Sequence, residues 1–301
     1  MTPVPVAGHD PVLLRETLQF LPLSSPQVLV DCTLGRAGHA SAYAKLLAPD
    51  GLLIGLDVDP RNLEYAQARL ADAPCRARLF HANFAELRDV LGELNLTHVD
   101  GILADLGVST NQLFEAPYGL SFSQPMPLDM RLDPHIRRSA ADLVNHLRED
   151  DLANVLYNNA QERYSRRIAK KIGEARRVSP ITTTDRLADI VRSALARRGG
   201  APEKIDPATR TFLALRMEVN QEMQNLESLL KQGPGFLAKG GRMAVISFQS
   251  MEDRVVKQAF RSAEQAGLVA SLTKKPISPA DDETAVNPRS RSAKLRAVEK
   301  L

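Results

Sequence analysis

The strongest constraint on the fold is an alternation of apolar strand patterns with helical patterns along the first third of the chain. Four buried-strand patterns precede Ser109, at residues 28–32, 52–57, 77–82 and 101–106, with helical patterns between them. Short connections between alternating strands and helices are typical of a parallel sheet whose two faces are covered by crossover helices. The sequence therefore predicts a doubly wound α/β core.

The pattern changes after Val108. Residues 109–134 contain several prolines and glycines and no clear period, and helical patterns then continue to about residue 230. Strand character returns at 242–248, and weaker strand-like runs follow at 268–273 and 294–298. A helical segment therefore interrupts the predicted sheet between its fourth and fifth strands.

These patterns divide the chain into two parts. We expect a core formed by residues 1–108 and 215–301, with a helical insertion at 109–214. One helix of the insertion is amphipathic, because Tyr164, Ile168 and Ile172 fall at helical spacing while basic side chains project elsewhere. A second helix is predicted to begin near Thr184, which is a suitable N-cap residue.

Composition limits the class of protein. The chain has 301 residues, of which 44% are hydrophobic and 25% charged, a balance typical of globular proteins. Only Cys32 and Cys75 occur, so no disulfide framework and no cysteine-rich zinc site is expected. No apolar run approaches the roughly 20 residues that cross a bilayer, and the N-terminus does not resemble a signal peptide. We expect a cytoplasmic protein that binds no metal and no membrane.

The sharpest local signal lies at residues 31–39, Asp-Cys-Thr-Leu-Gly-Arg-Ala-Gly-His, which follow a strand and open a helix. Gly35 and Gly38 allow a tight turn and a close approach to a ligand. Asp57 ends the next strand, where an acid can accept hydrogen bonds from both hydroxyls of an adenosine ribose. The combination predicts an adenosine-containing cofactor, although the glycines alone are compatible with an ordinary turn.

The residue at position 33 separates two kinds of cofactor. A dinucleotide fingerprint aligned on Gly35 and Gly38 requires glycine at Thr33, which is absent. S-adenosylmethionine (SAM) has no phosphate but carries a sulfonium, which an acid such as Asp31 can face. This favours a methyltransferase over a dehydrogenase. Asp105 ends the fourth strand and is a candidate active-site acid, or else a residue that caps the following turn.

Seven motifs occur in order along the chain. They are His9-Asp-Pro-Val-Leu-Leu, Gly35-Arg-Ala-Gly38-His39, Asp100-Gly-Ile-Leu-Ala-Asp105-Leu-Gly-Val-Ser109, Pro127-Leu-Asp-Met-Arg131, Ala208-Thr-Arg210-Thr-Phe212, Ser247-Phe-Gln-Ser-Met-Glu-Asp-Arg254 and Asn287-Pro-Arg-Ser-Arg291-Ser. Together they resemble the motifs of the RsmH (MraW) family of ribosomal RNA cytosine-N4 methyltransferases.

The resemblance implies a Rossmann-like class I SAM-dependent methyltransferase sheet with an inserted helical domain that recognises RNA. It implies that the enzyme methylates N4 of a cytidine in the decoding centre, the P-site region, of 16S ribosomal RNA in the small subunit. The residues that the resemblance implies for SAM binding are Ala37, Gly38, His39, Asp57, Phe84, Asp105 and Gln112, to which the glycine turn and the strand-end acid add Gly35 and Asp31. A homodimer is compatible with the sequence.

The chain departs from the family pattern at two positions. Ala37 stands where glycine is usual, and a backbone contact there tolerates alanine if φ is negative. Gln249 stands where histidine is common, which argues against an essential general base at that position.

Many amine methyltransferases carry Asp/Asn-Pro-Pro-aromatic after the fourth strand, but this chain has Asp105-Leu-Gly-Val. Asp105, or a carbonyl just after it, is therefore the candidate acceptor for the substrate amine.

Basic residues predict the RNA contacts, with a solvated helix face as the alternative. Seven of them lie between Arg163 and Arg177, against two glutamates. Candidate RNA-contacting residues are Arg131, Arg163, Arg166, Arg167, Lys170, Lys171, Arg210, Arg289 and Arg291, of which Arg131 and Arg210 alternatively organise the active site. Phe114, Tyr118 and Phe122 are candidates either for a platform under the target base or for the core.

Three alternatives stay open. The core motifs alone also fit a methyltransferase of DNA or of a small molecule. The glycine turn with Asp57 fits a nicotinamide-dependent dehydrogenase, although the first glycine is missing. A catalytically silent ribosome-assembly factor is the third alternative, against which the intact acids and glycines argue.

Overall fold

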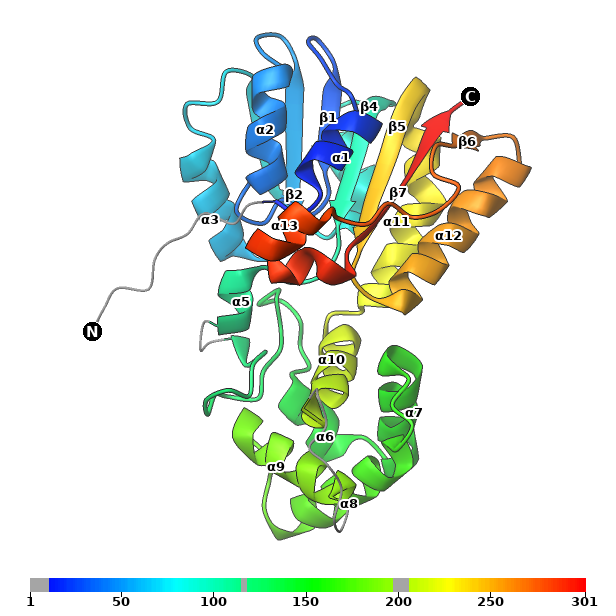
Figure 1. Cartoon of the computed structure of the whole chain (residues 1–301). Coiled ribbons are helices and arrows are strands. Elements are labelled where there is room, and N and C mark those ends of the chain that lie inside the picture. Colours follow the sequence, from blue (N-terminus) through cyan, green and yellow to red (C-terminus); the bar gives the residue numbers. More distant parts are fainter. Residues whose placement is uncertain (1–10, 115–117, 197–205) are drawn as a thin grey trace. The chain divides into compact units, whose positions relative to one another are not determined.

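The computed structural model describes residues 11–114, 118–196 and 206–301, and the chain forms two compact units (Figure 1). The first unit contains residues up to Gly107 and from Met223 onward, and the second contains Val108–Glu222. The predicted boundary at residue 215 is wrong. It falls inside helix α10 (Ala208–Val219), whose Leu215 and Val219 are buried in the core of the second unit.

The first unit is built on a seven-stranded sheet with the order β3-β2-β1-β4-β5-β7-β6. Strands β1 to β5 run parallel, whereas β7 is antiparallel to both β5 and β6. The chain order reverses between β1 and β4, so ligands are expected beyond the carboxyl ends of these strands. The strands are β1 (Val28–Asp31), β2 (Leu52–Asp57), β3 (Arg76–His81), β4 (Val99–Asp105), β5 (Leu237–Ser247), β6 (Val269–Ser271) and β7 (Lys294–Lys300).

All seven predicted strands are present, and the largest error is the start of β5. The sequence pattern predicts that this strand begins at residue 242, because the preceding Lys239-Gly-Gly has low strand propensity. The strand begins at Leu237 instead, and its register against β4 shifts between Val99 and Gly101. Gly240 has φ +76°, which a residue with a side chain rarely adopts. The glycines therefore allow an irregular stretch in which pairing with β4 continues.

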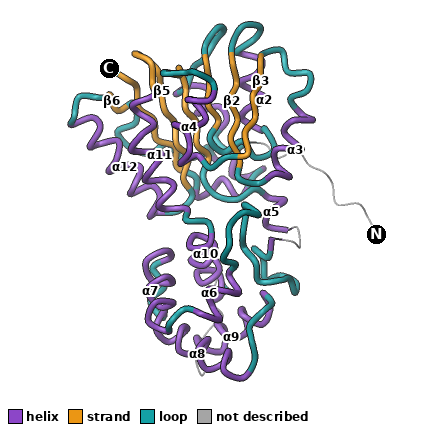
Figure 2. The backbone as a smooth tube through the Cα atoms, turned by 180° about the vertical axis from the view of Figure 1, so that it is seen from behind, coloured by secondary structure: helices purple, strands orange, loops and turns teal. Residues whose placement is uncertain are grey.

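Helices cover both faces of the sheet (Figures 1 and 2). Alternating side chains make this possible: Leu29 and Leu103 pack with α1, α2 and α3, whereas Val30 and Ile102 pack with α4, α11 and α12. The helices of this unit are α1 (Leu14–Phe20), α2 (Gly38–Leu46), α3 (Pro60–Arg69), α4 (Leu87–Glu93), α11 (Glu222–Phe236, beginning at the unit boundary), α12 (Ser250–Gln265) and α13 (Asp281–Val286), with 3-10 turns η1 (Phe84–Glu86) and η3 (Pro288–Ser292).

The second unit is helical, as predicted, with α5 (Thr110–Phe114), α6 (Ala140–His146), α7 (Glu149–Ala160), α8 (Ser165–Val178), α9 (Thr184–Leu195) and α10. Thr184 is not an N-cap, because it is the first helical residue and Thr183 holds the cap position. The Thr184 hydroxyl instead donates to the Gln124 carbonyl and accepts from the Met126 amide. In the described part of the chain, no helix is long and apolar enough to span a membrane.

Candidate active site

Three aspartates gather at the carboxyl edge of the sheet, because each is the last residue of a parallel strand. Asp31, Asp57 and Asp105 end β1, β2 and β4. Two hydrogen bonds connect them to the loop after β1. The Gly35 amide donates to Asp57 Oδ2 over 2.7 Å, and the Asp105 amide donates to Thr33 Oγ1 over 2.6 Å. The structure thus brings together residues that are up to 74 positions apart in the sequence.

The loop between β1 and α2 is a tight turn with two left-handed residues. Gly35 has φ +52° and Ala37 has φ +58°. The Ala37 amide donates to the Leu34 carbonyl, and α2 begins at Gly38. Thr33 has a positive role here, since its hydroxyl is the acceptor for the Asp105 amide. This position therefore joins the loop to β4, and a glycine there would lose that bond.

Asp57 is held rigidly by backbone donors. The Asp59 amide donates to Oδ1 and the Gly35 amide to Oδ2, while Asn62 Nδ2 lies 3.4 Å from Oδ2. Burial nevertheless raises the pKa of Asp57 to about 6, against the lowering effect of these donors. Oδ2 already has two donors, whereas Oδ1 has one and keeps a further lone pair, so a fixed Asp57 can still accept from a ribose hydroxyl at Oδ1.

Asp31 and Asp105 are strongly perturbed acids. Burial, with a smaller contribution from Asp57, raises the pKa of Asp31 to about 7. Burial also raises the pKa of Asp105 well above its usual value, and nearby acids raise it further. Asp105 Oδ1 is covered and has no hydrogen-bond partner among the described residues. A cationic ligand at this edge would relieve the repulsion between the acids.

Two further acids near Asp105 were not predicted from the sequence. Glu252, at the start of α12, accepts from the amides of Phe248 and Gln249, and Glu283 of α13 accepts from the Leu13 amide. Both raise the pKa of Asp105. The available signal was the Gln249-x-x-Glu252 spacing, which is typical of a helix start. Nothing in the sequence indicated that α12 and α13 meet the end of β4.

His39 lies beside Asp105 and is itself buried, with 6% of its side chain exposed. Its Nε2 is 3.0 Å from the Val12 carbonyl, and its Nδ1 is 3.9 Å from Asp105 Oδ2. Burial lowers the pKa of His39 to about 4, so the imidazole is neutral at pH 7. Since a carbonyl accepts only, Nε2 carries the ring proton and Nδ1 presents a lone pair to Asp105.

Comparison with known proteins assigns the family. The model of the MraW methylase family matches residues 6–301. The chain belongs to the MraW methylase family. Proteins named "Ribosomal RNA small subunit methyltransferase H" are similar over nearly their whole length. That of Syntrophotalea carbinolica is 46% identical, covering 98% of this chain and 99% of its own. Those of Geobacter sulfurreducens (46%; 98% and 99%) and Acidobacterium capsulatum (45%; 97% and 98%) are comparable.

As a MraW methylase, this protein is a SAM-dependent methyltransferase, and the site fits that cofactor. A sulfonium bears one positive charge, and the edge of the sheet presents Asp31, Asp57 and Asp105 with perturbed pKa values and an unpartnered buried oxygen. Phe84 opens η1 directly after β3 and is half-buried near the same edge. The class I sheet order confirms the predicted fold class.

The two departures from the family pattern have different outcomes. The condition of a negative φ at Ala37 is not met, because φ is +58°, and the methyl group is fully buried. This left-handed conformation costs alanine about 1 kcal/mol, whereas glycine adopts it readily. Gln249 holds the position before α12, and its backbone amide donates to the Glu252 carboxylate. Its replacement of histidine leaves this helix start intact.

The predicted cofactor residues are divided between the two units. Gln112 belongs to the second unit, where its Oε1 accepts from the Ser109 amide. The other predicted cofactor residues, from Asp31 to Asp105, all belong to the first unit. His9, in the first matched motif, lies outside the described residues.

The predicted RNA residues fall into two groups. Arg131 is structural: its Nε and Nη2 clasp Asp129 at 2.7 and 2.8 Å, and Nη1 donates to the Ile136 carbonyl. The others are exposed, although Arg166 pairs with Asp150 and Lys171 with Glu174. The exposed residues are Arg163, Arg166, Arg167, Lys170 and Lys171 on or just before α8, Arg210 on α10, and Arg289 and Arg291 on η3.

The aromatic residues offered as a platform are core residues where the structure describes them. Tyr118 is 5% exposed and lies in the core of the second unit. Phe122 packs on Phe212 with ring centroids 4.7 Å apart. The side chain of Phe114 lies outside the described residues. The core alternative is therefore correct for Tyr118 and Phe122.

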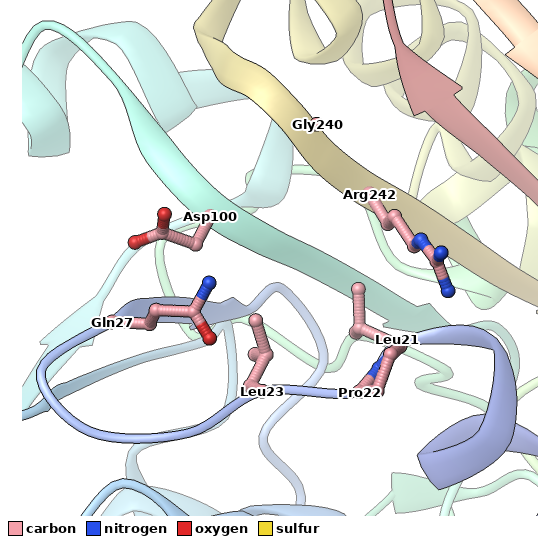
Figure 3. Close-up of a pocket in the computed structure, with 7 residues that line it drawn as sticks. All are labelled: Leu21, Pro22, Leu23, Gln27, Asp100, Gly240 and Arg242. Carbon is pink, nitrogen blue, oxygen red and sulfur yellow. The ribbon is translucent and has the colours of Figure 1, made fainter.

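A separate small hollow lies at the opposite, amino edge of the sheet (Figure 3). Its polar groups are already engaged. Asp100 accepts from the Val28 amide over 2.8 Å, and Arg242 Nε lies 2.7 Å from Glu299. The buried acids with raised pKa values, Asp31, Asp57 and Asp105, are at the other edge, so the hollow is not the active site.

Proposed function

We propose that this MraW methylase transfers a methyl group from SAM to the exocyclic N4 amine of a cytidine in the decoding centre of 16S ribosomal RNA. The proposal rests on the name shared by its relatives, on the basic face of α8, and above all on Asp105 at the end of β4. When bound, SAM supplies an electrophilic methyl group and a positive charge. The chain's own residues must then hold the amine, orient it and dispose of a proton.

Asp105 is suited to the amine. The lone pair of a cytosine amine is delocalised into the ring, so the nitrogen attacks only if it becomes pyramidal. A fixed oxygen that accepts a hydrogen bond from one N–H of the amine favours the pyramidal shape. The same oxygen receives the proton as the nitrogen–methyl bond forms. The carboxyl of Asp105 is held at its main chain by Thr33 and is only 24% exposed. Rigid placement of this kind supplies much of the rate in bimolecular transfers.

The second unit supplies charge for the RNA. Exposed Arg163, Arg167 and Lys170 lie on or beside α8 and suit contacts to phosphates, which fix register without reading sequence. Arg289 and Arg291 on η3 suit the same role. A target base must also be unstacked to reach Asp105. The 16S partner, a homodimer and the absence of a metal stay predictions.

Transfer of labelled methyl groups tests the function directly. The protein is incubated with labelled SAM and either free 16S RNA or small subunits that lack the modification, and the labelled nucleotide is mapped. We expect label on the N4 amine of one cytidine. Label on a ring carbon or on a ribose oxygen, or label accepted only by DNA, would refute the proposal.

A further inference from the structure

The pair formed by His39 and Asp105 has a hydrogen-bond pattern that needs an explanation. His39 donates through Nε2 to the Val12 carbonyl, so the nitrogen that faces Asp105 is a bare lone pair. A carboxylate oxygen is also an acceptor only. Two acceptors that face each other repel, unless a proton lies between them.

The surroundings of Asp105 place that proton on its carboxyl group. Oδ1 is covered and finds no hydrogen-bond partner among the described residues. A covered oxygen without a partner costs less free energy as the carbonyl oxygen of a neutral acid than as a negatively charged carboxylate oxygen. Asp31 of β1, Glu252 of α12 and Glu283 of α13 face the same group, and with burial they raise its pKa. The proton then lies on Oδ2, the oxygen nearest to His39 Nδ1.

We propose that His39 is a positioning residue that receives the Asp105 proton, so that Asp105 Oδ2 works as a relay between the substrate amine and His39 Nδ1. The inference rests on the proposed function in taking an amine as the substrate. The present separation of 3.9 Å is longer than a hydrogen bond, and contacts of this kind commonly tighten when substrates bind.

The step balances in atoms and charge. As the nitrogen–methyl bond forms and the sulfur–methyl bond breaks, the amine N–H bond breaks and its proton passes to Oδ2. The Oδ2–H bond breaks at the same time, and that proton passes to Nδ1. The carboxyl group stays neutral throughout. One positive charge disappears from sulfur and one appears on the imidazole, so the charge surrounded by Asp31, Glu252 and Glu283 is unchanged.

His39 has two separable contacts, and two amide substitutions divide them. The glutamine amide reaches the position of Nε2, so His39→Gln keeps a donor for the Val12 carbonyl and removes the acceptor beside Asp105. The asparagine amide reaches only the position of Nδ1, so His39→Asn keeps an acceptor and loses the Val12 contact. Tyr43→Phe is a matched control in the same helix, because the Tyr43 hydroxyl also holds the N-terminal segment, through the carbonyls of Thr17 and Leu21.

The test measures kcat, KM and SAM affinity for the three variants, together with thermal stability. We expect His39→Gln to lower kcat by about 10- to 100-fold at saturating SAM, with stability near that of the wild type. We expect His39→Asn to lose stability but to retain more of kcat, and Tyr43→Phe to lose stability only. Equal losses of kcat in both His39 variants, or none in His39→Gln, would overturn the proposal.

A spectroscopic measurement separates this inference from the proposed function. Nitrogen-15 NMR of the full chain, with the His39 signals assigned by their loss in His39→Gln, reports which ring nitrogen is protonated whether or not RNA is methylated. We expect a protonated Nε2 and an Nδ1 whose shift indicates an accepted hydrogen bond in the SAM complex, lost in Asp105→Ala. A protonated Nδ1 would refute the relay even if cytidine is methylated. The expected pattern with label on another atom would refute the function alone.

Discussion

The buried acids of the first unit and the exposed bases of the second differ in how their surroundings affect ionisation. Asp31 and Asp105 lie at the sheet edge, where burial and mutual repulsion oppose ionisation. Arg166 and Lys171 of α8 are roughly half or more exposed and form ion pairs on the surface. A buried charge costs stability until a counter-charge arrives, whereas a surface charge is screened and costs little. The acids are therefore suited to a small cation held tightly, and the bases to a long polyanion held by many weak contacts.

Asp31→Asn should have the largest effect on stability. The folded-state pKa of about 7 lies above the ordinary value of 3.8, so the folded protein binds the proton more tightly than the unfolded chain. The free energy of unfolding of the SAM-free protein therefore falls as pH rises from about 4 to 7. The variant should remove the Asp31 contribution to this dependence, leaving those of Asp57 and Asp105, and gain up to about 4 kcal/mol at pH 8.

Urea denaturation of both proteins between pH 4 and 8 measures this effect. In the wild type the Thr33 amide donates to Asp31 Oδ1 over 3.2 Å. The asparagine side chain of the variant can still accept this bond through its carbonyl oxygen, so the loop contact is retained. Equal pH dependence in both proteins would contradict the view that Asp31 is a buried, strained acid.

Asp57→Ala should weaken SAM binding by at least about 100-fold, since it removes a charged acceptor for the ribose and also the acceptor that holds the Gly35 amide of the cofactor loop. Calorimetry measures the loss, and Glu64→Ala, an exposed acid on α3, is the control that should bind normally. Because the pKa of Asp57 is about 6, wild-type affinity should rise between pH 5 and 7 as the carboxylate ionises. Normal affinity in Asp57→Ala would remove Asp57 from the site.

The double variant Arg167→Ala/Lys170→Ala should weaken RNA binding by about 10-fold at low salt and lower the salt slope by about 1 to 2, with unchanged stability. Arg176→Ala is the structural contrast on the same helix. Its guanidinium donates to the carbonyls of Val144 and Leu147, each over 2.7 Å, so its loss should cost about 2 kcal/mol of stability. Binding titrations at several salt concentrations and thermal melts separate the two. An unchanged salt slope in the double variant would show that the basic face of α8 contacts solvent and not RNA.

Ala37→Gly should have the smallest effect, below about 1 kcal/mol. Glycine relieves the left-handed backbone but loses a buried methyl group and gains freedom in the unfolded chain, and these terms nearly cancel. Melting curves and SAM calorimetry measure both consequences. A change in SAM affinity of more than about threefold would show that the alanine methyl group shapes the cofactor loop.

The sequence by itself determined the α/β core, the strand-end positions of Asp31, Asp57 and Asp105, and the glycine turn. These follow from local patterns, because strand periodicity and turn residues depend on neighbours along the chain. Tertiary structure alone decided that Glu252 and Glu283 meet Asp105, that His39 faces it with a lone pair, and that φ is positive at Ala37. Those facts depend on packing between segments up to 178 positions apart. Protonation and strain are set by such neighbours, which no local pattern encodes.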